Sequence, residues 1–352
     1  MASPPFDREL HVRYFLQNLR SLPEPYAPQD SQRVVLVRWT AEYESEVYDS
    51  SNIASTFAAL CILRTLGDDL SRVNKAAVIG SLRRLQNKQT GRYQASARLA
   101  AASAADFAPV LLSYCCSFSS VSSGSEEDMR FVYCACAISH LLDDWSGVDL
   151  VAMVRFINSC LVSCCLEQDP LRLLLPLCLL LEPYRLRVWL QSYDGGIGIT
   201  AGAESHGGAV FCATASLILS GRIMQLNCDQ SELVRWLVLR QHGGFQGRCN
   251  KDPDSCYAFW DGATLDLLGK HSLVDVPSCK QFIMSCQFLY GGLCKFPDTV
   301  PDVMHSYYSL AWLSIAAHSN SSSAAGAQTS ELPKLKALDT KLQVPFFPRP
   351  SK

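Results

Sequence analysis

Several features that would assign a simple role are missing from this 352-residue chain. Its net charge is only −2, which gives no basis for bulk electrostatic attraction to nucleic acid or to an anionic membrane. The leucine-rich run at residues 173–181 is broken by Pro176 and falls far short of the about 20 residues that cross a bilayer. No charged segment followed by an apolar stretch stands at the start. We therefore expect neither a transmembrane segment nor a secretory signal.

The sequence also lacks paired CxxC motifs at the spacing of a structural zinc site, although it contains 16 cysteines. Without an export signal, these cysteines are expected to be free thiols in a reducing compartment, the cytoplasm. Many of them, such as Cys134, Cys136 and Cys212, stand at apolar helical positions, where cysteine acts as a small core residue. With 48% hydrophobic residues, the chain can bury a large core.

The most informative feature that is present is an internal repeat. Glycine pairs at 195–196, 243–244 and 291–292 begin 48 residues apart (243 − 195 and 291 − 243). At fixed distances behind each pair stand a polar residue, an aromatic residue, an alanine and a leucine. Weaker copies place Phe57 and Tyr133 at the aromatic position. Since two helices with their turns fill such a period, the repeat predicts an all-α fold of stacked or closed helical hairpins.

Two segments interrupt the repeat. The spacing from Phe57 to Tyr133 is 76 (133 − 57) and from Tyr133 to Phe211 is 78 (211 − 133), which exceeds one period by about 28 to 30 residues each time. The extra residues lie at about 92–124, rich in Ala, Ser and Cys, and at about 162–189, around the leucine run. They are either true insertions or sequence that a shorter version of the chain lacks. The second explanation is favoured because an exposed leucine run promotes aggregation.

Two short segments, 247–260 and 301–308, hold most of the chemically active side chains. Asp254 and Cys256 lie 11 and 13 residues behind one glycine pair, and His305 lies 14 behind the next. Equivalent positions of adjacent repeats are neighbours in space, so these side chains can converge on one zinc ion. Three protein ligands leave a fourth position open, as in catalytic zinc sites. The alternative is that Asp254 caps a helix and Cys256 belongs to the core.

A second polar group stands beside the first. Arg248 and Lys251 precede Asp254, while His206 and Tyr257 hold offsets 11 and 14 in their own repeats. Helix N-termini favour anions, and these donors would complete a pocket for a diphosphate. The alternative is a solvated loop in which Arg248 and Lys251 pair with acidic neighbours.

Five strings together resemble the β subunits of protein prenyltransferases, and within that family the type I geranylgeranyl group. The resemblance covers roughly residues 8–32, 48–91, 125–161 and 190–316, and neither interruption belongs to it. The strings are GDDLSRVNK (67–75), DMRFVYCA (128–135), ESHGGAVFC (204–212), GRCNKDPDSCYAFWDGATL (247–265) and PDVMHSYYSL (301–310).

The resemblance implies an α/α toroid over residues 1–318 whose inner helices surround an aromatic-lined funnel. It further implies a catalytic β subunit that pairs with a separate α subunit. Such a heterodimer transfers geranylgeranyl from geranylgeranyl diphosphate to the cysteine of C-terminal Cys-a-a-Leu motifs, as in small GTPases, and forms a thioether. A farnesyltransferase β subunit, or a splice-type variant that binds the α subunit without turnover, is the alternative. A terpene cyclase would need a D-x-D-D motif, which the chain lacks.

The resemblance also assigns roles to single residues. It implies that Asp254, Cys256 and His305 bind zinc, and that Met304 and Tyr308 recognise the last residue of the acceptor motif. The implied diphosphate ligands are His206, Arg248, Lys251 and Tyr257, and the implied isoprenoid wall is Arg130, Tyr133, Phe211 and Trp260.

Lys295 distinguishes between members of the family. It stands ten residues before the zinc histidine (305 − 10), where the farnesyl enzymes have an aspartate that helps to hold magnesium. A fixed ammonium group can neutralise diphosphate charge without a second metal. We therefore expect zinc dependence with little magnesium dependence. The alternative is a lysine that extends from a loop into solvent.

The chain departs from the family near its start and near its end. Between Gln32 and about Val47 the family has a full helical hairpin, whereas this chain has only residues 33–46. The toroid is therefore expected to be incomplete on its N-terminal side, with apolar surface left uncovered and turnover in doubt. Residues 319–352 are polar and then proline-rich, which predicts a loose or disordered tail.

Overall fold

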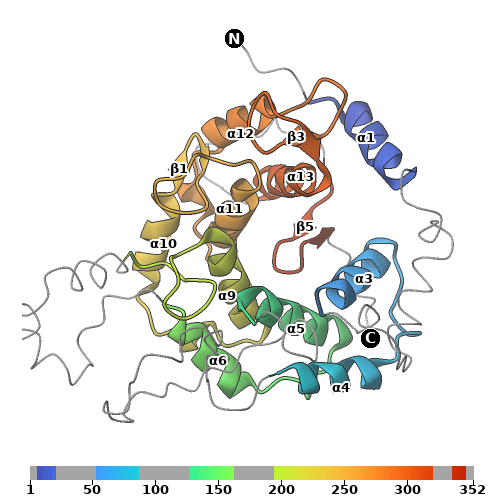
Figure 1. The fold of residues 1–352 in the computed structure, drawn as a ribbon, viewed down its shortest axis with the longest axis vertical. Helices are drawn as coiled ribbons and strands as arrows, with labels where there is room; N and C mark the ends of the chain where they lie inside the picture. Colours follow the sequence, from blue (N-terminus) through green and yellow to red (C-terminus); the bar gives the residue numbers. More distant parts are fainter. Residues whose placement is uncertain (1–5, 21–52, 87–126, 162–193, 320–334, 346–352) are drawn as a thin grey trace, which may run out of the picture.

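The computed structural model describes residues 6–20, 53–86, 127–161, 194–319 and 335–345 (Figure 1). These residues form α-helices and small two-stranded hairpins. The α-helices are α1 (Arg8–Arg20), α3 (Ile53–Thr65), α4 (Lys75–Leu85), α5 (Met129–Leu142), α6 (Leu150–Ser159), α9 (Gly207–Leu219), α10 (Gln230–Val238), α11 (Tyr257–Leu267), α12 (Val276–Ser285) and α13 (Val303–His318). The short elements are η4 (Ile223–Gln225), η5 (His271–Leu273), β1 (Gln241–His242), β2 (Gly244–Phe245), β3 (Leu293–Cys294), β4 (Pro301–Asp302), β5 (Leu338–Asp339) and β6 (Val344–Pro345).

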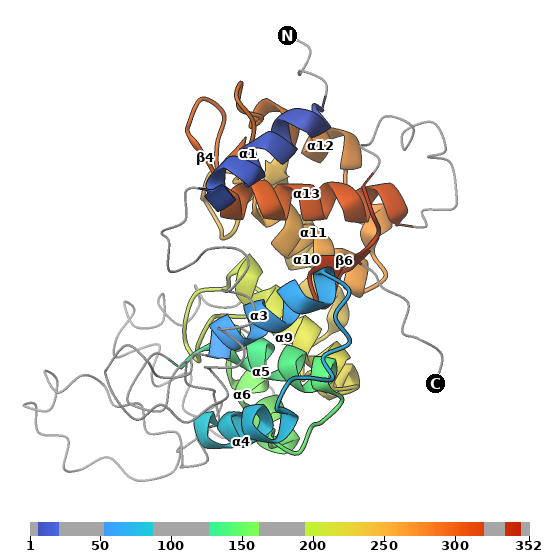
Figure 2. The same cartoon turned by 90° about the vertical axis from the view of Figure 1, so that its right-hand side faces the viewer.

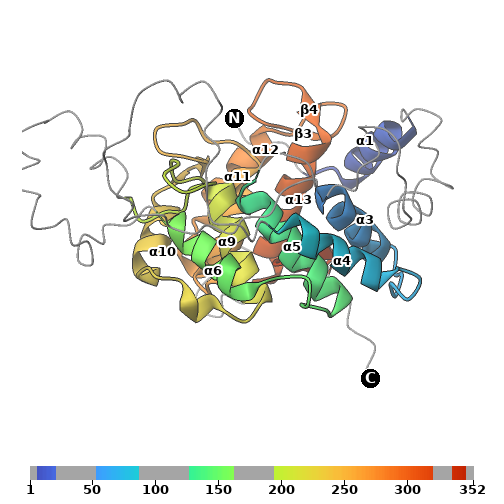
Figure 3. The same cartoon turned by 60° about the horizontal axis from the view of Figure 1, so that its bottom comes forward.

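The helices form two layers of a curved array. An inner row consists of α3, α5, α9, α11 and α13, each packed against the next, and the row can be followed around the centre in Figure 1 and Figure 3. An outer row consists of α4, α6, α10 and α12, which cover the outside of the inner row. The array of helical hairpins expected from the 48-residue repeat is therefore confirmed.

Burial explains why the inner helices lie where they do. Most residues of α5 and α9 are buried, and their sequences are rich in Ala, Cys, Val and Leu on every face. A helix that is apolar all round must be covered on all sides, which happens between the outer row and the centre. Outer helices are amphipathic instead: α6 buries Met153, Phe156 and Ile157 but leaves Val151 exposed.

The constant spacing among the copies of the repeat has a structural cause. Its polar position lies at the start of an inner helix, where Asp128 caps α5, His206 caps α9 and Asp302 caps α13 by accepting a backbone hydrogen bond. The first glycine of each pair has a positive φ, for example 77° at Gly243. Such a backbone conformation favours glycine, so the pairs mark the turns that lead toward the inner helices.

Part of the segment expected to be a loose tail is ordered. Residues 335–345 contain the antiparallel pair β5–β6, and Leu342 and Val344 are buried in the core. In Figure 1 the hairpin lies inside the helical array, and in Figure 2 β6 lies beside the end of α3. The hairpin contacts α3 through β6 and α13 through β5. The expectation of a loose tail is therefore wrong for these residues, because buried apolar side chains hold them in place.

Other expectations fall on residues that the structure does not describe. The interruptions at about 92–124 and 162–189 and the shortened stretch 33–46 lie outside the described ranges. Among the residues that are described, no helix combines the length and the apolar character that crossing a membrane requires.

Candidate functional site

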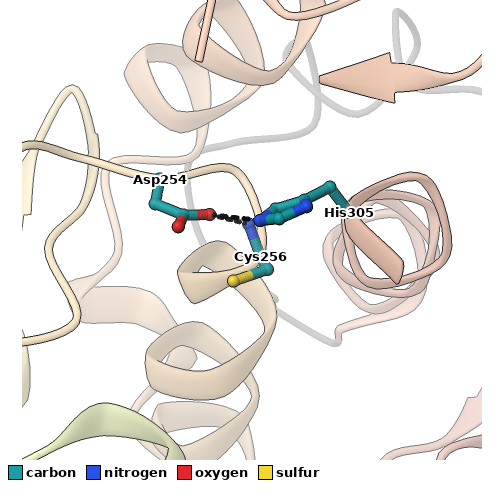
Figure 4. Close-up of side chains that lie close together, drawn as sticks. All are labelled: Asp254, Cys256 and His305. Carbon is teal, nitrogen blue, oxygen red and sulfur yellow. Dashed lines mark hydrogen bonds and ion pairs between the residues drawn. The ribbon is translucent and has the colours of Figure 1, made fainter. Parts of the chain in front are cut away.

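The three residues expected to bind zinc come together at the start of two adjacent inner helices. Asp254 and Cys256 immediately precede α11, and His305 lies in the first turn of α13 (Figure 4). All three are buried, and each offers a ligand atom within 4.8 Å of the others. The repeat places them there because α11 and α13 start at equivalent positions of consecutive hairpins.

Hydrogen bonds orient His305 between two carboxylates. Its Nδ1 lies 2.5 Å from Oδ2 of Asp302, and its Nε2 lies 3.3 Å from Oδ1 of Asp254. When the ring is protonated, both nitrogens donate to the carboxylates; when it is neutral, Asp302 accepts the proton of Nδ1, which leaves the lone pair on Nε2, the nitrogen that faces Asp254. Asp302 therefore fixes the tautomer that a metal ligand needs. Sequence reasoning identified Asp302 only as a repeat position, because its second contact depends on side-chain geometry.

Charge and burial act together on this cluster. Burial lowers the pKa of His305, but hydrogen bonds to Asp254 and Asp302 outweigh it and raise the pKa above its ordinary value. For Asp254, burial raises the pKa, while hydrogen bonds from His305 and Cys256 bring it below the usual range. Burial, followed by the charge of Asp254, raises the pKa of the Cys256 thiol. A metal cation that binds the Cys256 sulfur would displace the thiol proton, so metal binding at this cluster is expected to release a proton and to depend on pH.

The donor set and its spacing fit a zinc ion. Zinc takes oxygen, nitrogen and sulfur ligands at about 2.0–2.3 Å, so two ligands of a tetrahedral ion lie about 3.3–3.6 Å apart. The separation of 3.3 Å between His305 Nε2 and Asp254 Oδ1 falls in that range. Three residues supply ligands and none of the three is exposed, which suits an ion with one position left for a substrate.

Lys295 lies at the edge of this cluster. Its Nζ is 3.6 Å from Oδ2 of Asp254, and half of its side chain is exposed. The backbone of the same residue accepts a hydrogen bond from Ser255, which ties the Lys295 loop to the start of α11. The positive charge expected beside the metal ligands is therefore present, and it contacts Asp254 directly.

Two of the expected diphosphate ligands are hydrogen-bonded to each other. His206 Nδ1 accepts from the backbone N–H of Gly208, so the proton of the neutral ring is on Nε2. That nitrogen lies 2.8 Å from the hydroxyl oxygen of Tyr257 and donates to it. The Tyr257 hydroxyl keeps its own proton for another acceptor. Burial, with Arg248 next, lowers the pKa of His206, which agrees with a neutral ring.

A tight backbone contact positions the Tyr257 ring. A Cβ at Gly247 would lie 2.0 Å from Cζ of Tyr257, so only glycine fits there. The carbonyl of Gly247 also accepts from the N–H of Gly207 at the start of α9. Arg248, the next residue, pairs with Glu204 at 3.3 Å, and Lys251 is exposed in the same loop. Of these two cations, Arg248 is the one whose charge acts on the pKa of His206.

Arg130 contacts both an aromatic ring and a carboxylate: its guanidinium carbon lies 5.4 Å from the centroid of the Phe131 ring. Its guanidinium group pairs with Asp128, the cap of α5, at 2.5 Å. Its charge also contributes to the lowered pKa of His206. The charge of Arg130 thus acts on one of the expected diphosphate ligands, and its place in the isoprenoid wall stays a prediction.

The other wall residues form a continuous row of rings across the inner helices. Ring centroids are 5.5 Å apart for Tyr133 and Phe211, 5.3 Å for Phe211 and Trp260, and 4.4 Å for Trp260 and Tyr308. Phe57 extends the row from α3, at 5.3 Å from Tyr133. Tyr308, assigned to peptide recognition, therefore belongs to the row. The aromatic position of the repeat is the signal that includes Phe57.

Met304 differs from Tyr308 in its surroundings. Its side chain is 52% exposed in the first turn of α13, one residue before His305. Its role in recognition of the acceptor motif stays a prediction.

A family model described as the prenyltransferase alpha-alpha toroid domain matches residues 6–43, 40–163 and 188–344. The chain belongs to the prenyltransferase α/α toroid family. The matched ranges include the first interruption at about 92–124, and most of the second, at about 162–189, lies between them. The likeness to prenyltransferases inferred from the five strings is thereby confirmed.

Sequence relatives within this prenyltransferase family are β subunits. The geranylgeranyl transferase type-1 subunit beta of Arabidopsis thaliana is 37% identical over 279 residues, which cover 76% of this chain and 60% of the relative. The protein of the same name from Dictyostelium discoideum is 37% identical over 276 residues, 78% of this chain and 63% of the relative. A protein farnesyltransferase subunit beta of Pyricularia oryzae is 28% identical over 371 residues, 89% of this chain and 63% of the relative. The chain thus spans about three-fifths of the length of the curated relatives it matches.

A solved structure supports the toroid fold. Candida albicans protein geranylgeranyltransferase-I complexed with GGPP superposes with a TM-score of 0.68 at 21% identity, over 97% of this chain and 96% of that chain. At this level of identity, the likeness shows the architecture of the helical array.

Proposed function

We propose that this chain is the catalytic β subunit of a zinc-dependent protein prenyltransferase. The heterodimer would transfer geranylgeranyl from geranylgeranyl diphosphate to the cysteine of a C-terminal Cys-a-a-Leu motif and form a thioether. One observation carries the proposal: the ligand atoms of Asp254, Cys256 and His305 lie within 4.8 Å of one another, and Cys256 directly precedes Tyr257, which is hydrogen-bonded to His206. A metal cluster for a thiol and donors for a diphosphate therefore adjoin at one helix start.

The residues divide the chemistry between them. When bound by Asp254, Cys256 and His305, zinc supplies a charge that lowers the pKa of a substrate thiol, ordinarily about 8.5, so that thiolate is present at neutral pH. As the bond from the acceptor sulfur to carbon 1 forms, the bond from carbon 1 to the diphosphate oxygen breaks. Negative charge grows on the departing diphosphate, where the Tyr257 hydroxyl can donate its free proton. Such donors act most strongly on the transition state.

Cationic residues and the aromatic row complete the substrate site. Arg248 and Lys251 would neutralise the diphosphate, and Arg130, close enough to act on His206, would join them. The row from Tyr133 to Tyr308 offers an apolar surface for the isoprenoid chain. Lys295, 3.6 Å from Asp254, would take the place of a second metal, so magnesium would not be required.

The partner and the compartment belong to the same proposal. The relatives are named as β subunits, which supports pairing with an α subunit. Acceptors would be proteins that end in Cys-a-a-X, such as small GTPases. None of the cysteines that the structure describes forms a disulfide, which agrees with the cytoplasm. Because the chain spans about three-fifths of its relatives, its turnover requires a direct test.

The test is co-expression with a prenyltransferase α subunit, followed by metal analysis and transfer of labelled geranylgeranyl to a peptide ending in Cys-a-a-Leu. The expected result is one zinc per heterodimer and transfer that stops when the peptide cysteine is replaced by serine. Cys256→Ser should lose both metal and transfer. Competition with farnesyl diphosphate separates the geranylgeranyl enzyme from a farnesyl enzyme. A stable heterodimer that holds zinc but transfers neither group would overturn the catalytic assignment.

A further inference from the structure

The carboxylate of Asp194 joins three segments that are distant from it in the sequence. Its Oδ1 accepts hydrogen bonds from the N–H of Gly196 at 3.1 Å and from the hydroxyl of Ser205 at 2.5 Å. Its Oδ2 accepts from Nε1 of Trp236, in α10, at 2.8 Å, and from the thiol of Cys249 at 3.8 Å. The chemistry described so far leaves Asp194 without a role, although its side chain accepts from four donors.

Two of these donors stand next to expected diphosphate ligands. Ser205 directly precedes His206, the cap of α9, and Cys249 directly follows Arg248 in the loop after β2. The side chain of Asp194 therefore lies between the two segments that supply His206 and Arg248.

Two direct contacts also join the start of α9 to the Arg248 loop. The N–H of Gly207 donates to the carbonyl of Gly247 at 2.9 Å, and Arg248 pairs with Glu204 at 3.3 Å. The side chains of this ion pair are both about half exposed, and an exposed pair contributes little to holding a loop. A diphosphate that binds Arg248 would also compete with Glu204. The contacts through Asp194 do not depend on Arg248, so they hold the loop when the guanidinium group turns to a ligand.

Trp236 makes the Asp194 segment rigid. The tryptophan is 1% exposed, and a Cβ added at Gly196 would lie 2.9 Å from Cε2 of its ring and 2.6 Å from Oγ of Ser205. The backbone after Asp194 is therefore packed tightly against both partners. A carboxylate suits this place because an ionised carboxylate only accepts hydrogen bonds, and the four groups around it are donors.

We propose, on the basis of the function proposed above, that Asp194 is a positioning residue for diphosphate binding. Its carboxylate holds the loop that carries Arg248 against the start of α9, beside His206, and it acts through these residues. Because the loop is ordered before the ligand arrives, binding does not have to supply the free energy of ordering it. The affinity for the diphosphate group of the substrate is higher as a result.

The test compares Asp194→Asn with the wild-type heterodimer in transfer of geranylgeranyl to a peptide ending in Cys-a-a-Leu. Asparagine has the size of aspartate but replaces one acceptor oxygen with a donor, so two of the four donors lose their acceptor. The KM for geranylgeranyl diphosphate should rise by about tenfold, while kcat and the KM for the peptide stay within about twofold of the wild type. Inorganic pyrophosphate lacks the isoprenoid, so its inhibition constant should rise by the same factor as this KM.

Asp229→Asn is the matched control. Asp229 caps α10, the helix of Trp236, by accepting from the N–H of Ser231. Asparagine caps helices as well as aspartate does, so both constants should keep their wild-type values. Ser205→Ala is a second test variant. It removes the shortest of the four contacts without placing a donor against a donor, and it should raise both constants by a smaller factor than Asp194→Asn.

Unchanged constants in both test variants, or an equal loss of kcat, zinc content and peptide binding, would overturn the positioning role and leave the prenyltransferase proposal intact. If Asp194→Asn does not form a heterodimer, the constants of Ser205→Ala decide between these outcomes. A wild-type heterodimer that neither transfers geranylgeranyl nor binds pyrophosphate would overturn both conclusions.

Discussion

The Nδ1 atom of His305 lies 2.5 Å from Oδ2 of Asp302, a residue of the same helix start. Oδ1 of that carboxylate accepts from the backbone N–H of His305 at 2.9 Å, so Asp302 both caps α13 and orients the ring. A second partner that fixes the ring in this way strengthens a metal ligand, because it holds both the tautomer and the direction of the lone pair.

We expect Asp302→Asn to weaken zinc binding by about 10–100-fold, because the amide preserves the helix cap but lacks the negative charge opposite Nδ1. Zinc affinity is measured by competition with a chelating dye. Asp275→Asn, which alters the cap of α12 away from the metal, is the control and should bind zinc as the wild type does. Equal affinity in the Asp302 variant would show that the contact does not support the site.

Gly247→Ala should lower prenyl transfer by about a hundredfold while zinc content stays unchanged. The added Cβ would lie 2.0 Å from Cζ of Tyr257, so the ring must move and its 2.8 Å contact with His206 breaks. Single-turnover transfer measures the loss. Gly80→Ala is the control. Gly80 lies within α4, and a Cβ added there would be 3.9 Å from its nearest neighbour, so this variant should keep full activity and gain about 0.5–1 kcal/mol of stability. Full transfer by the Gly247 variant would contradict the role of the Tyr257 position.

The stability of the heterodimer should fall as the pH drops below 6.5, the ordinary pKa of histidine. Burial, with Arg248 next, lowers the pKa of His206 in the folded state, so between that lowered value and 6.5 the unfolded chain binds the additional proton. The contribution of His206 is thus complete above 6.5 and is lost as the pH falls toward the folded pKa. His206→Asn keeps a capping side chain but cannot titrate, so its thermal unfolding temperature should decline less steeply below pH 6.5. Identical slopes for the two proteins would refute this assignment.

Replacing Lys295 with aspartate should make transfer responsive to magnesium, whereas the wild type should not respond. The lysine ammonium lies 3.6 Å from Asp254, and a carboxylate at that place would remove a positive charge and offer the oxygen ligand that magnesium prefers. Transfer rates are compared across a magnesium titration at constant zinc. Lys295→Ala should lose rate without gaining a response. A Lys295→Asp enzyme that ignores magnesium would count against a charge-compensating role.

The repeat made the metal cluster predictable from the sequence, because Asp254 and His305 hold neighbouring positions of consecutive hairpins. The polar and glycine positions of the repeat were also predictable. Each has a local cause, because the polar residue caps a helix and the glycine adopts a positive φ. The hairpin at 335–345 was not predictable. It carries no copy of the repeat, and its order depends on distant partners such as Tyr133 and Tyr307. The position of Arg130 also required the structure, because Asp128 competes for its charge.

The contacts of the β5–β6 hairpin bear on how the chain is made. Tyr133 and Lys341 are separated by 208 residues, and Cys61 and Leu342 by 281. During synthesis on the ribosome, the tyrosines of the emerging array must wait for the hairpin before their hydroxyl groups find acceptors. Contacts of such long range form slowly and leave apolar surface open in the meantime. The nascent protein is therefore expected to expose apolar surface, the feature that chaperones bind, until residues 335–345 have emerged.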